Sequence, residues 1–196
     1  MKGQLGNDDG MDAARGWRNL GEQPVVETPW FWLRRARVEL PGGRQLDHYL
    51  LRLPPLTMTA MLDDQDRVLL LWRHRFIPDA WGWELPSGIA GPGADADGDA
   101  DAAGLAATAS RQALAESGWE AIRPEPLLTL RQNAGLTDSA VHVFVTRQAI
   151  YRGPPEADFE AERIEWIPLS RTPALIAGGE IRDASTATAL LWLARG

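Results

Sequence analysis

The sequence is most constrained by its short apolar segments, which end at clusters of Pro, Gly or Asp. Such segments are typical of β-strands joined by tight turns. Residues 30–43 and 44–53 alternate between apolar and polar side chains around a Pro-Gly-Gly turn, and they predict a hairpin. Residues 57–64 and 67–75 are more continuously apolar, and they predict two central, buried strands joined by an Asp-rich turn.

The second half of the chain combines strand and helix signals. Residues 105–117 predict a helix that ends at Gly118, since glycine is favoured just after a helix. One or two further helices are expected over residues 170–196. Further strands are predicted at residues 126–135, 139–150 and 163–169. Strands interleaved with helices in this way indicate an α/β fold with a mixed sheet packed between helices.

Composition changes at two places along the chain. Residues 1–22 contain no apolar run, so they predict a disordered tail and no signal peptide. The remaining residues, 23–196, are enough for one well-packed core and predict a single domain. Within it, residues 91–104 are a run of Ala, Asp and Gly, which predicts a solvated insertion.

Charge and cysteine content exclude several classes of protein. The formal net charge of -7 and the pI near 5.0 argue against nucleic acid or an anionic membrane as a partner. No apolar run reaches the roughly 20 residues that span a bilayer. The chain has no cysteine, which excludes disulfides, thiolate metal sites and a cysteine nucleophile. A cytoplasmic protein is expected.

One stretch carries a recognisable motif. The sequence WELPSGIAGPG at residues 83–93, followed by a helix carrying RQALAESGW at residues 111–119, resembles the Nudix box. Further segments resemble the ADP-ribose and nucleoside-diphosphate-sugar pyrophosphatase branch of the Nudix hydrolases, in order, from about residue 29 to residue 194. The resemblance implies the Nudix fold, an α/β/α sandwich with a mixed β-sheet, and a homodimer. It also implies cleavage of a pyrophosphate in an ADP-ribose-like or nucleotide-sugar substrate with Mg²⁺ or Mn²⁺.

The box is degenerate in this sequence. Its two glycines and its arginine are retained at Gly88, Gly118 and Arg111. The signature's spacing of 14 from Gly88 predicts the arginine at position 102 instead of 111, so the insertion is 9 residues long. Three glutamate positions are occupied by Ala94, Gln112 and Ala115, which leaves Glu116 as the remaining box carboxylate. Oxygen ligands of hard cations are best supplied by carboxylates, so the metal site is expected to be weak.

The resemblance implies roles for particular residues. The expected metal ligands are Glu116, the backbone carbonyl of Ser87 and, weakly, Gln112. The expected catalytic residues are Glu116, Arg111 as a support for the box, and Glu160 or Glu162 as a base or an additional ligand. Arg73 and Arg75 are expected to contact the pyrophosphate.

Alternatives remain open at several of these positions. The acidic residues 156–162 also fit a solvated loop, and the two arginines also fit an exposed strand side. Trp30, Trp32, Trp81 and Trp83 could stack on a nucleobase or fill a core or dimer interface. The lost glutamates raise a second functional hypothesis, an inactive nucleotide-binding or regulatory protein, and a dimeric structural protein is a third.

Overall fold

The computed structural model describes residues 16–90, 102–156 and 161–195. They group into two compact units. The first unit contains Met1–Leu53 with Gly135–Thr137, and the second contains Pro54–Ala134 with Asp138–Gly196. The single-domain organisation expected over residues 23–196 stays a prediction.

The first unit is a three-stranded antiparallel sheet in the order β1-β2-β3. Its strands are β1 (Arg18–Glu27), β2 (Trp32–Glu39) and β3 (Gln45–Arg52). The β2–β3 pair confirms the predicted hairpin. Residues 18–22 were expected to belong to a disordered tail, but they are part of β1. Nearly all their side chains are exposed, and pairing with β2 supplies the hydrogen bonds of their backbone.

An ion pair links the outer strands of this sheet. Arg52 at the end of β3 donates to the carboxylate of Glu22 in β1. The hydrogen bond from Arg52 is the largest influence on Glu22 and lowers the pKa of its carboxyl. The edge strand β1, which has little apolar burial, is therefore held by backbone pairing and charge.

The second unit contains three small sheets, in the orders β7-β4-β10-β9, β12-β5-β6 and β11-β8. Its strands are β4 (Leu56–Met61), β5 (Arg67–Arg75), β6 (Ala80–Glu84), β7 (Ser87–Ile89), β8 (Trp119–Ala121), β9 (Glu125–Leu130), β10 (Val141–Thr146), β11 (Ala149–Tyr151) and β12 (Arg163–Pro168). β10 runs parallel to β4, whereas the other neighbours are antiparallel. The predicted mixed sheet is confirmed.

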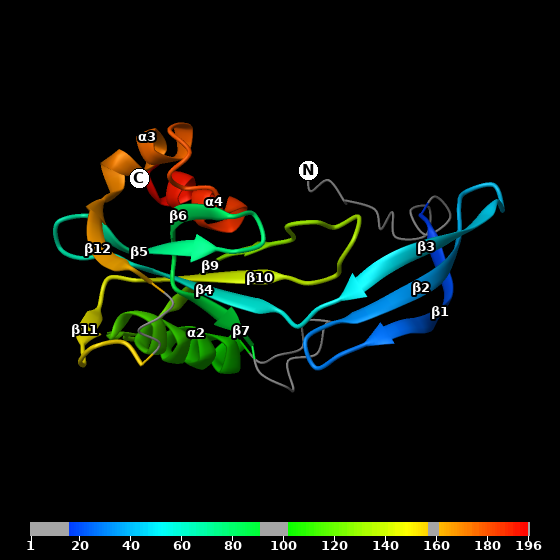
Figure 1. Ribbon diagram of the computed structural model, residues 1–196, viewed down its shortest axis with the longest axis horizontal. Coiled ribbons are helices and arrows are strands. Elements are labelled where there is room, and N and C mark those ends of the chain that lie inside the picture. Colours follow the sequence, from blue (N-terminus) through cyan, green and yellow to red (C-terminus); the bar gives the residue numbers. More distant parts are fainter. Residues whose placement is uncertain (1–15, 91–101, 157–160, 196) are drawn as a thin grey trace, which may run out of the picture. The chain divides into compact units, whose positions relative to one another are not determined.

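Helices cover both sides of these strands (Figure 1). α2 (Ala102–Ser117) lies on one side, and α3 (Thr172–Ala177) and α4 (Ala184–Leu193) lie on the other. A short 3₁₀ turn, η1 (Leu169–Arg171), precedes α3. This is the predicted α/β/α arrangement.

Alternation along β5 divides its side chains between the two helical layers. Val68 and Leu70 pack in the core that contains Leu190 of α4. Leu69 packs instead with Ala113 of α2. The same alternation carries Trp72 to the α3–α4 side and Arg73 to the α2 side. The charged side chain of Arg73 is thereby directed towards α2, which carries the second half of the Nudix box.

The carboxyl end of α2 is fixed by a glycine and by a distant segment. Gly118 has φ +74°, and its N–H donates to Leu114 O at 2.8 Å. A Cβ at this position would lie 1.9 Å from Gly153 O. The N–H groups of Arg152 and Glu156 donate to Gly118 O at 2.9 Å and Ala115 O at 3.0 Å. The glycine predicted to end the helix is therefore required both by its backbone conformation and by close packing.

Gly118→Ala is expected to destabilise the protein by about 2–4 kcal/mol, because it combines left-handed strain with a clash against backbone. Gly104→Ala is the matched control: Gly104 lies within α2, and a Cβ there would meet nothing within 4 Å. That variant should be neutral or up to about 1 kcal/mol more stable. Chemical denaturation measures both, and equal stability of the two variants would contradict the packing argument.

Candidate functional site

Glu116 is held at a junction of three elements. It projects from the last turn of α2 and is 7% exposed. Arg73 of β5 donates to it twice, from Nη1 to Oε1 at 3.3 Å and from Nη2 to Oε2 at 3.0 Å. The backbone N–H of Ser87, at the start of β7, donates to Oε2 at 2.9 Å. The remaining box carboxylate is thus buried and hydrogen-bonded to both a cation and the box turn.

A second buried carboxylate, Glu84 of β6, extends the cluster. Arg75 donates to it from Nε at 3.1 Å to each oxygen and from Nη2 to Oε2 at 2.6 Å. Arg73 Nε lies 3.5 Å from Glu84 Oε2. Glu116, Arg73, Glu84 and Arg75 therefore form a continuous row of alternating charge, which we call the charge cluster.

Strand register explains why these side chains meet. Leu71 is paired with Glu84, and Arg73 is paired with Gly82, so Arg73 and Glu84 lie diagonally on one face of the β5–β6 pair. Gly82 has no side chain opposite Arg73. Sequence reasoning did not single out Glu84. One sequence signal could have identified it. Glu84 lies inside the apolar segment WGWEL and follows a strand that carries Arg73 and Arg75, and a buried carboxylate requires such a partner.

The other box residues on α2 add little to a metal site. Gln112 packs over Gly88 so closely that a Cβ on Gly88 would lie 2.3 Å from Gln112 Cδ. The first box glycine therefore makes room for this side chain. Ala115 offers no side-chain oxygen. Arg111 is exposed, and its Nη2 donates to Thr108 Oγ1 at 3.1 Å, so this bond does not support Glu116. The catalytic role expected for Arg111 stays a prediction.

The acidic segment is described only at its ends. Glu162 is exposed, and its N–H donates to Trp72 O at 2.9 Å, which places its backbone beside the strand that carries Arg73. Glu160 and most of the predicted insertion, residues 91–101, lie outside the described residues. The last residues of that insertion, 102–104, belong to α2.

The four tryptophans considered for base stacking lie in different parts of the protein. Trp83 is paired with Trp72, and the centres of their rings lie 5.1 Å apart. Trp81 is paired with His74, and their ring centres lie 5.3 Å apart. Alternation places this aromatic group on the opposite face of β5 from Arg73. Trp81 and Trp83 therefore do not face the charge cluster. Trp30 and Trp32 belong to the first unit.

The described donors do not fit a divalent-metal cage. Within the parts of the chain that the structure describes, no group of three or more His, Cys, Asp or Glu side chains is placed to share a metal ion. Three hydrogen bonds already occupy the Glu116 carboxylate. The Mg²⁺ or Mn²⁺ requirement expected from the sequence stays a prediction.

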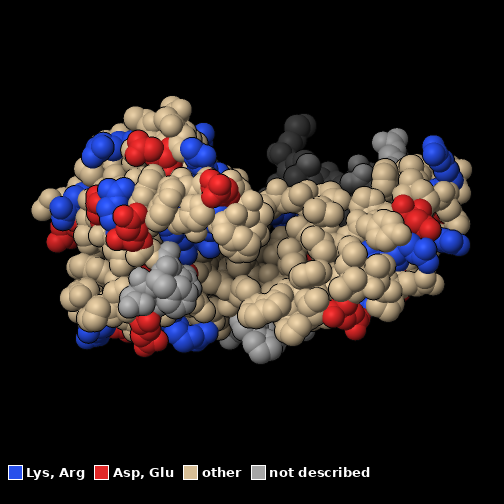
Figure 2. Space-filling view, viewed as in Figure 1, with Lys and Arg blue, Asp and Glu red and all other residues tan. Residues whose placement is uncertain are grey.

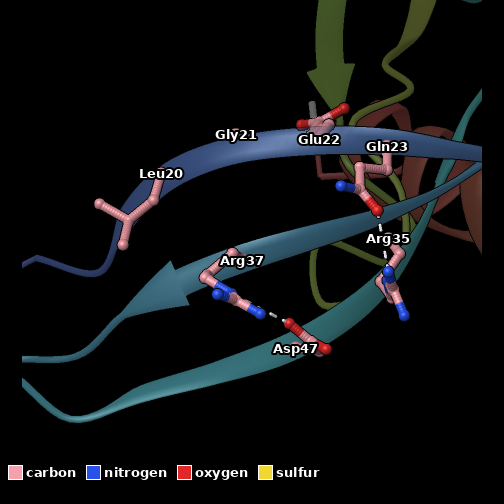
Figure 3. Close-up of a pocket in the computed structure, with 7 residues that line it drawn as sticks. All are labelled: Leu20, Gly21, Glu22, Gln23, Arg35, Arg37 and Asp47. Carbon is pink, nitrogen blue, oxygen red and sulfur yellow. Dashed lines mark hydrogen bonds and ion pairs between the residues drawn. The ribbon is translucent and has the colours of Figure 1, made fainter.

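The first unit has a separate hollow of about 330 Å³ (Figure 3). Polar pairs span it, with Arg35 Nη2 donating to Gln23 Oε1 at 2.8 Å and Arg37 Nε lying 3.5 Å from Asp47 Oδ1. It contains none of the sequence-predicted site residues. Figure 2 shows acidic and basic side chains next to one another on the visible face.

Comparison with known proteins decides the family. A solved structure of an ADP compounds hydrolase superposes with a TM-score of 0.73, over 91% of this chain and 92% of that one, at 15% identity, and so shows the fold. A CMP-5'-(N-acetyl-N-hydroxy-3-aminopropyl)phosphonate hydrolase from Streptomyces rubellomurinus is 34% identical over 175 residues, which is 89% of this chain and 81% of the relative. The chain belongs to the Nudix hydrolase family.

The N-terminal unit has a family match of its own. A model described as the nucleoside diphosphate sugar hydrolase N-terminal domain matches residues 17–51, nearly all of the β1–β2–β3 sheet. The Nudix resemblance inferred from the sequence is confirmed. The match begins inside the segment that was expected to be a disordered tail, in agreement with the position of β1.

Restoring the lost carboxylates gives a direct test of the Nudix box. Gln112→Glu with Ala115→Glu is expected to raise metal-dependent hydrolysis about 10-fold or more, because it adds two anionic ligands to the helix that carries Glu116. The measurement is release of nucleoside monophosphate with Mn²⁺ or Mg²⁺. The control for added charge is Ala103→Glu with Ala107→Glu, which adds two glutamates at exposed positions of the same helix. A folded double variant without increased activity would count against the expectation that the missing box carboxylates limit hydrolysis.

Proposed function

We propose that this chain hydrolyses the phosphoric anhydride of a small molecule joined to a nucleoside phosphate, such as an ADP-ribose-like or nucleoside-diphosphate-sugar substrate. The proposal is supported by the 34% identity to a hydrolase of a CMP-linked phosphonate over nearly the whole chain. The structural observation that supports an active site is the buried cluster around Glu116, at the Ser87–Gly88 turn of the Nudix box.

Arg75 is the phosphate contact that we propose. Its side chain is 48% exposed, while Glu84 fixes its guanidinium through Nε and Nη2. A charged group that is held in place yet open to solvent is prearranged for an anionic ligand. Arg73 is 2% exposed and acts through Glu116. Glu162, which is exposed beside β5, is the described candidate for a base that orients the attacking water.

Nucleotide binding without hydrolysis is the second candidate function. It is favoured by the neutral residues Gln112 and Ala115 and by the engagement of Glu116 with Arg73 and Ser87. A binding protein needs the phosphate contact of Arg75 and does not need a nucleophile. The two functions predict the same ligand class and differ in turnover.

The deciding experiment incubates the protein with ADP-ribose, nucleotide sugars and a CMP-linked phosphonate, with Mg²⁺, Mn²⁺ or EDTA. Hydrolysis is read as released nucleoside monophosphate, and binding as a rise in Tm. Glu116→Gln should abolish turnover, whereas Glu165→Gln, at an exposed position on β12, should not. Ligand-dependent stabilisation without turnover would select the binding function, and neither response would contradict both.

Arg75→Gln is expected to weaken substrate binding by roughly 10- to 100-fold, because it removes a charge-assisted hydrogen bond to phosphate. The change should appear mainly in KM, or in Kd if the protein only binds. Arg163→Gln is the matched control, since Arg163 lies over the rings of Trp72 and Trp83, on the other face of the strand. Equal losses in the two variants would rule out a specific phosphate contact.

Assembly and location complete the proposal. We infer a cytoplasmic homodimer whose contact includes β1, because Leu20, Val25 and Val26 of that strand are exposed apolar residues. Light scattering on the purified protein measures the oligomeric state. Among the described residues, no helix is long and apolar enough to cross a membrane.

A further inference from the structure

Arg73 lies between two buried carboxylates that belong to different elements. Its guanidinium reaches Glu116 through Nη1 and Nη2 and Glu84 through Nε. Arg73 is 2% exposed, Glu84 8% and Glu116 7%, so water screens these charges little. The guanidinium therefore stabilises carboxylates of the strand β6 and of the helix α2 at the same time.

Among the described residues, the charges of the four side chains in the charge cluster sum to zero. Glu84 and Glu116 contribute two negative charges, and Arg73 and Arg75 contribute two positive charges. Two buried carboxylates without a cation would carry a large desolvation cost and would repel each other. The planar guanidinium of Arg73 meets both through separate nitrogen atoms, because its Nη atoms donate hydrogen bonds to Glu116 and its Nε lies at ion-pair distance from Glu84.

The hydrogen bonds at Glu116 leave little capacity for another cation. A carboxylate has about four lone-pair positions. Arg73 occupies one on Oε1 and one on Oε2, and the Ser87 N–H occupies a second on Oε2. A divalent ion that binds Glu116 has to compete with a charged donor and with the backbone of the box turn.

We propose that Arg73 is a positioning residue that serves as a built-in counter-ion for Glu84 and Glu116, in the role that a divalent cation would otherwise fill. The local structure of the Nudix box is then independent of metal. Removing the positive charge of Arg73 converts the two carboxylates into a binding site for a divalent cation. This inference does not depend on whether the protein hydrolyses its ligand, because it concerns the protein and the metal ion alone.

The test compares Tm and Mn²⁺ binding in wild-type protein and in Arg73→Gln, without nucleotide. Wild-type Tm should be the same in EDTA and in MnCl₂. Arg73→Gln should have a lower Tm in EDTA and regain about 5 °C when Mn²⁺ reaches roughly 100 times its Kd. Electron paramagnetic resonance of free Mn²⁺ measures the binding directly and should report one site gained.

Three further variants make the test specific. Arg73→Gln combined with Glu116→Gln should lose the gained Mn²⁺ site. Arg73→Lys keeps the charge, so its Tm should stay independent of Mn²⁺ even though the bidentate geometry is lost. Arg163→Gln removes an arginine from the opposite face and should gain no Mn²⁺ site.

Two outcomes would overturn the proposal. One is a folded Arg73→Gln protein with unchanged Tm and no gain in Mn²⁺ binding. The other is wild-type protein that Mn²⁺ already stabilises in a manner abolished by Glu116→Gln, because Arg73 would then not replace the cation. If Arg73→Gln does not fold at any Mn²⁺ concentration, the wild-type and Arg73→Lys measurements decide: metal-independent Tm in both supports the proposal, and metal-dependent Tm in either opposes it.

Discussion

The buried ion pair between Arg73 and Glu116 is the interaction on which the rest of the site depends. It joins β5 to the last turn of α2, and the same carboxylate accepts the N–H of Ser87 at the box turn. Removing one partner of a buried pair costs about 3–5 kcal/mol, since the other charge is left without compensation. One carboxylate therefore positions a strand, a helix and a turn. Arg75 is linked to the same cluster through Glu84.

This arrangement distinguishes Glu116 from the other glutamate positions of the Nudix box. Glu116 has a structural partner in Arg73, so its replacement would leave a buried guanidinium unbalanced. Position 112 has a different environment, where the Gln112 side chain packs against Gly88. Position 115 carries only a methyl group, and its backbone carbonyl is bound by a distant amide. The retained carboxylate is the one with a role in the fold itself.

Much of the fold could be predicted from periodicity, and the exceptions have physical causes. The hairpin of β2 and β3, the helix α2 and its terminal Gly118 follow from local patterns. β7, β8 and β11 have three residues each, too few for a pattern of alternation, and β6 contains Gly82 between two tryptophans. β1 is exposed on nearly all its side chains, so pairing with β2 defines it and its own sequence does not.

The site was harder to predict than the fold, because its geometry comes from pairs of strands. Arg73 and Arg75 were identified as candidates, but their partner Glu84 becomes visible only when β5 and β6 are in register. Family resemblance located Glu116, whereas its bond to Arg73 required the α2 packing. Local sequence reports which residues carry charge, and tertiary pairing determines which charges cancel.

The amides of Arg152 and Glu156 cap the carboxyl end of α2, and this has a dynamic consequence. Helix ends usually fray, since their last carbonyls lack partners. Here those partners come from the stretch that leads into the acidic segment, and Gly118 packs against Gly153. Opening the end of this helix therefore also breaks hydrogen bonds to the chain before residue 157. The amides of Arg152 and Glu156 and the last turn of the helix are expected to share similar protection from exchange, because the same hydrogen bonds hold both.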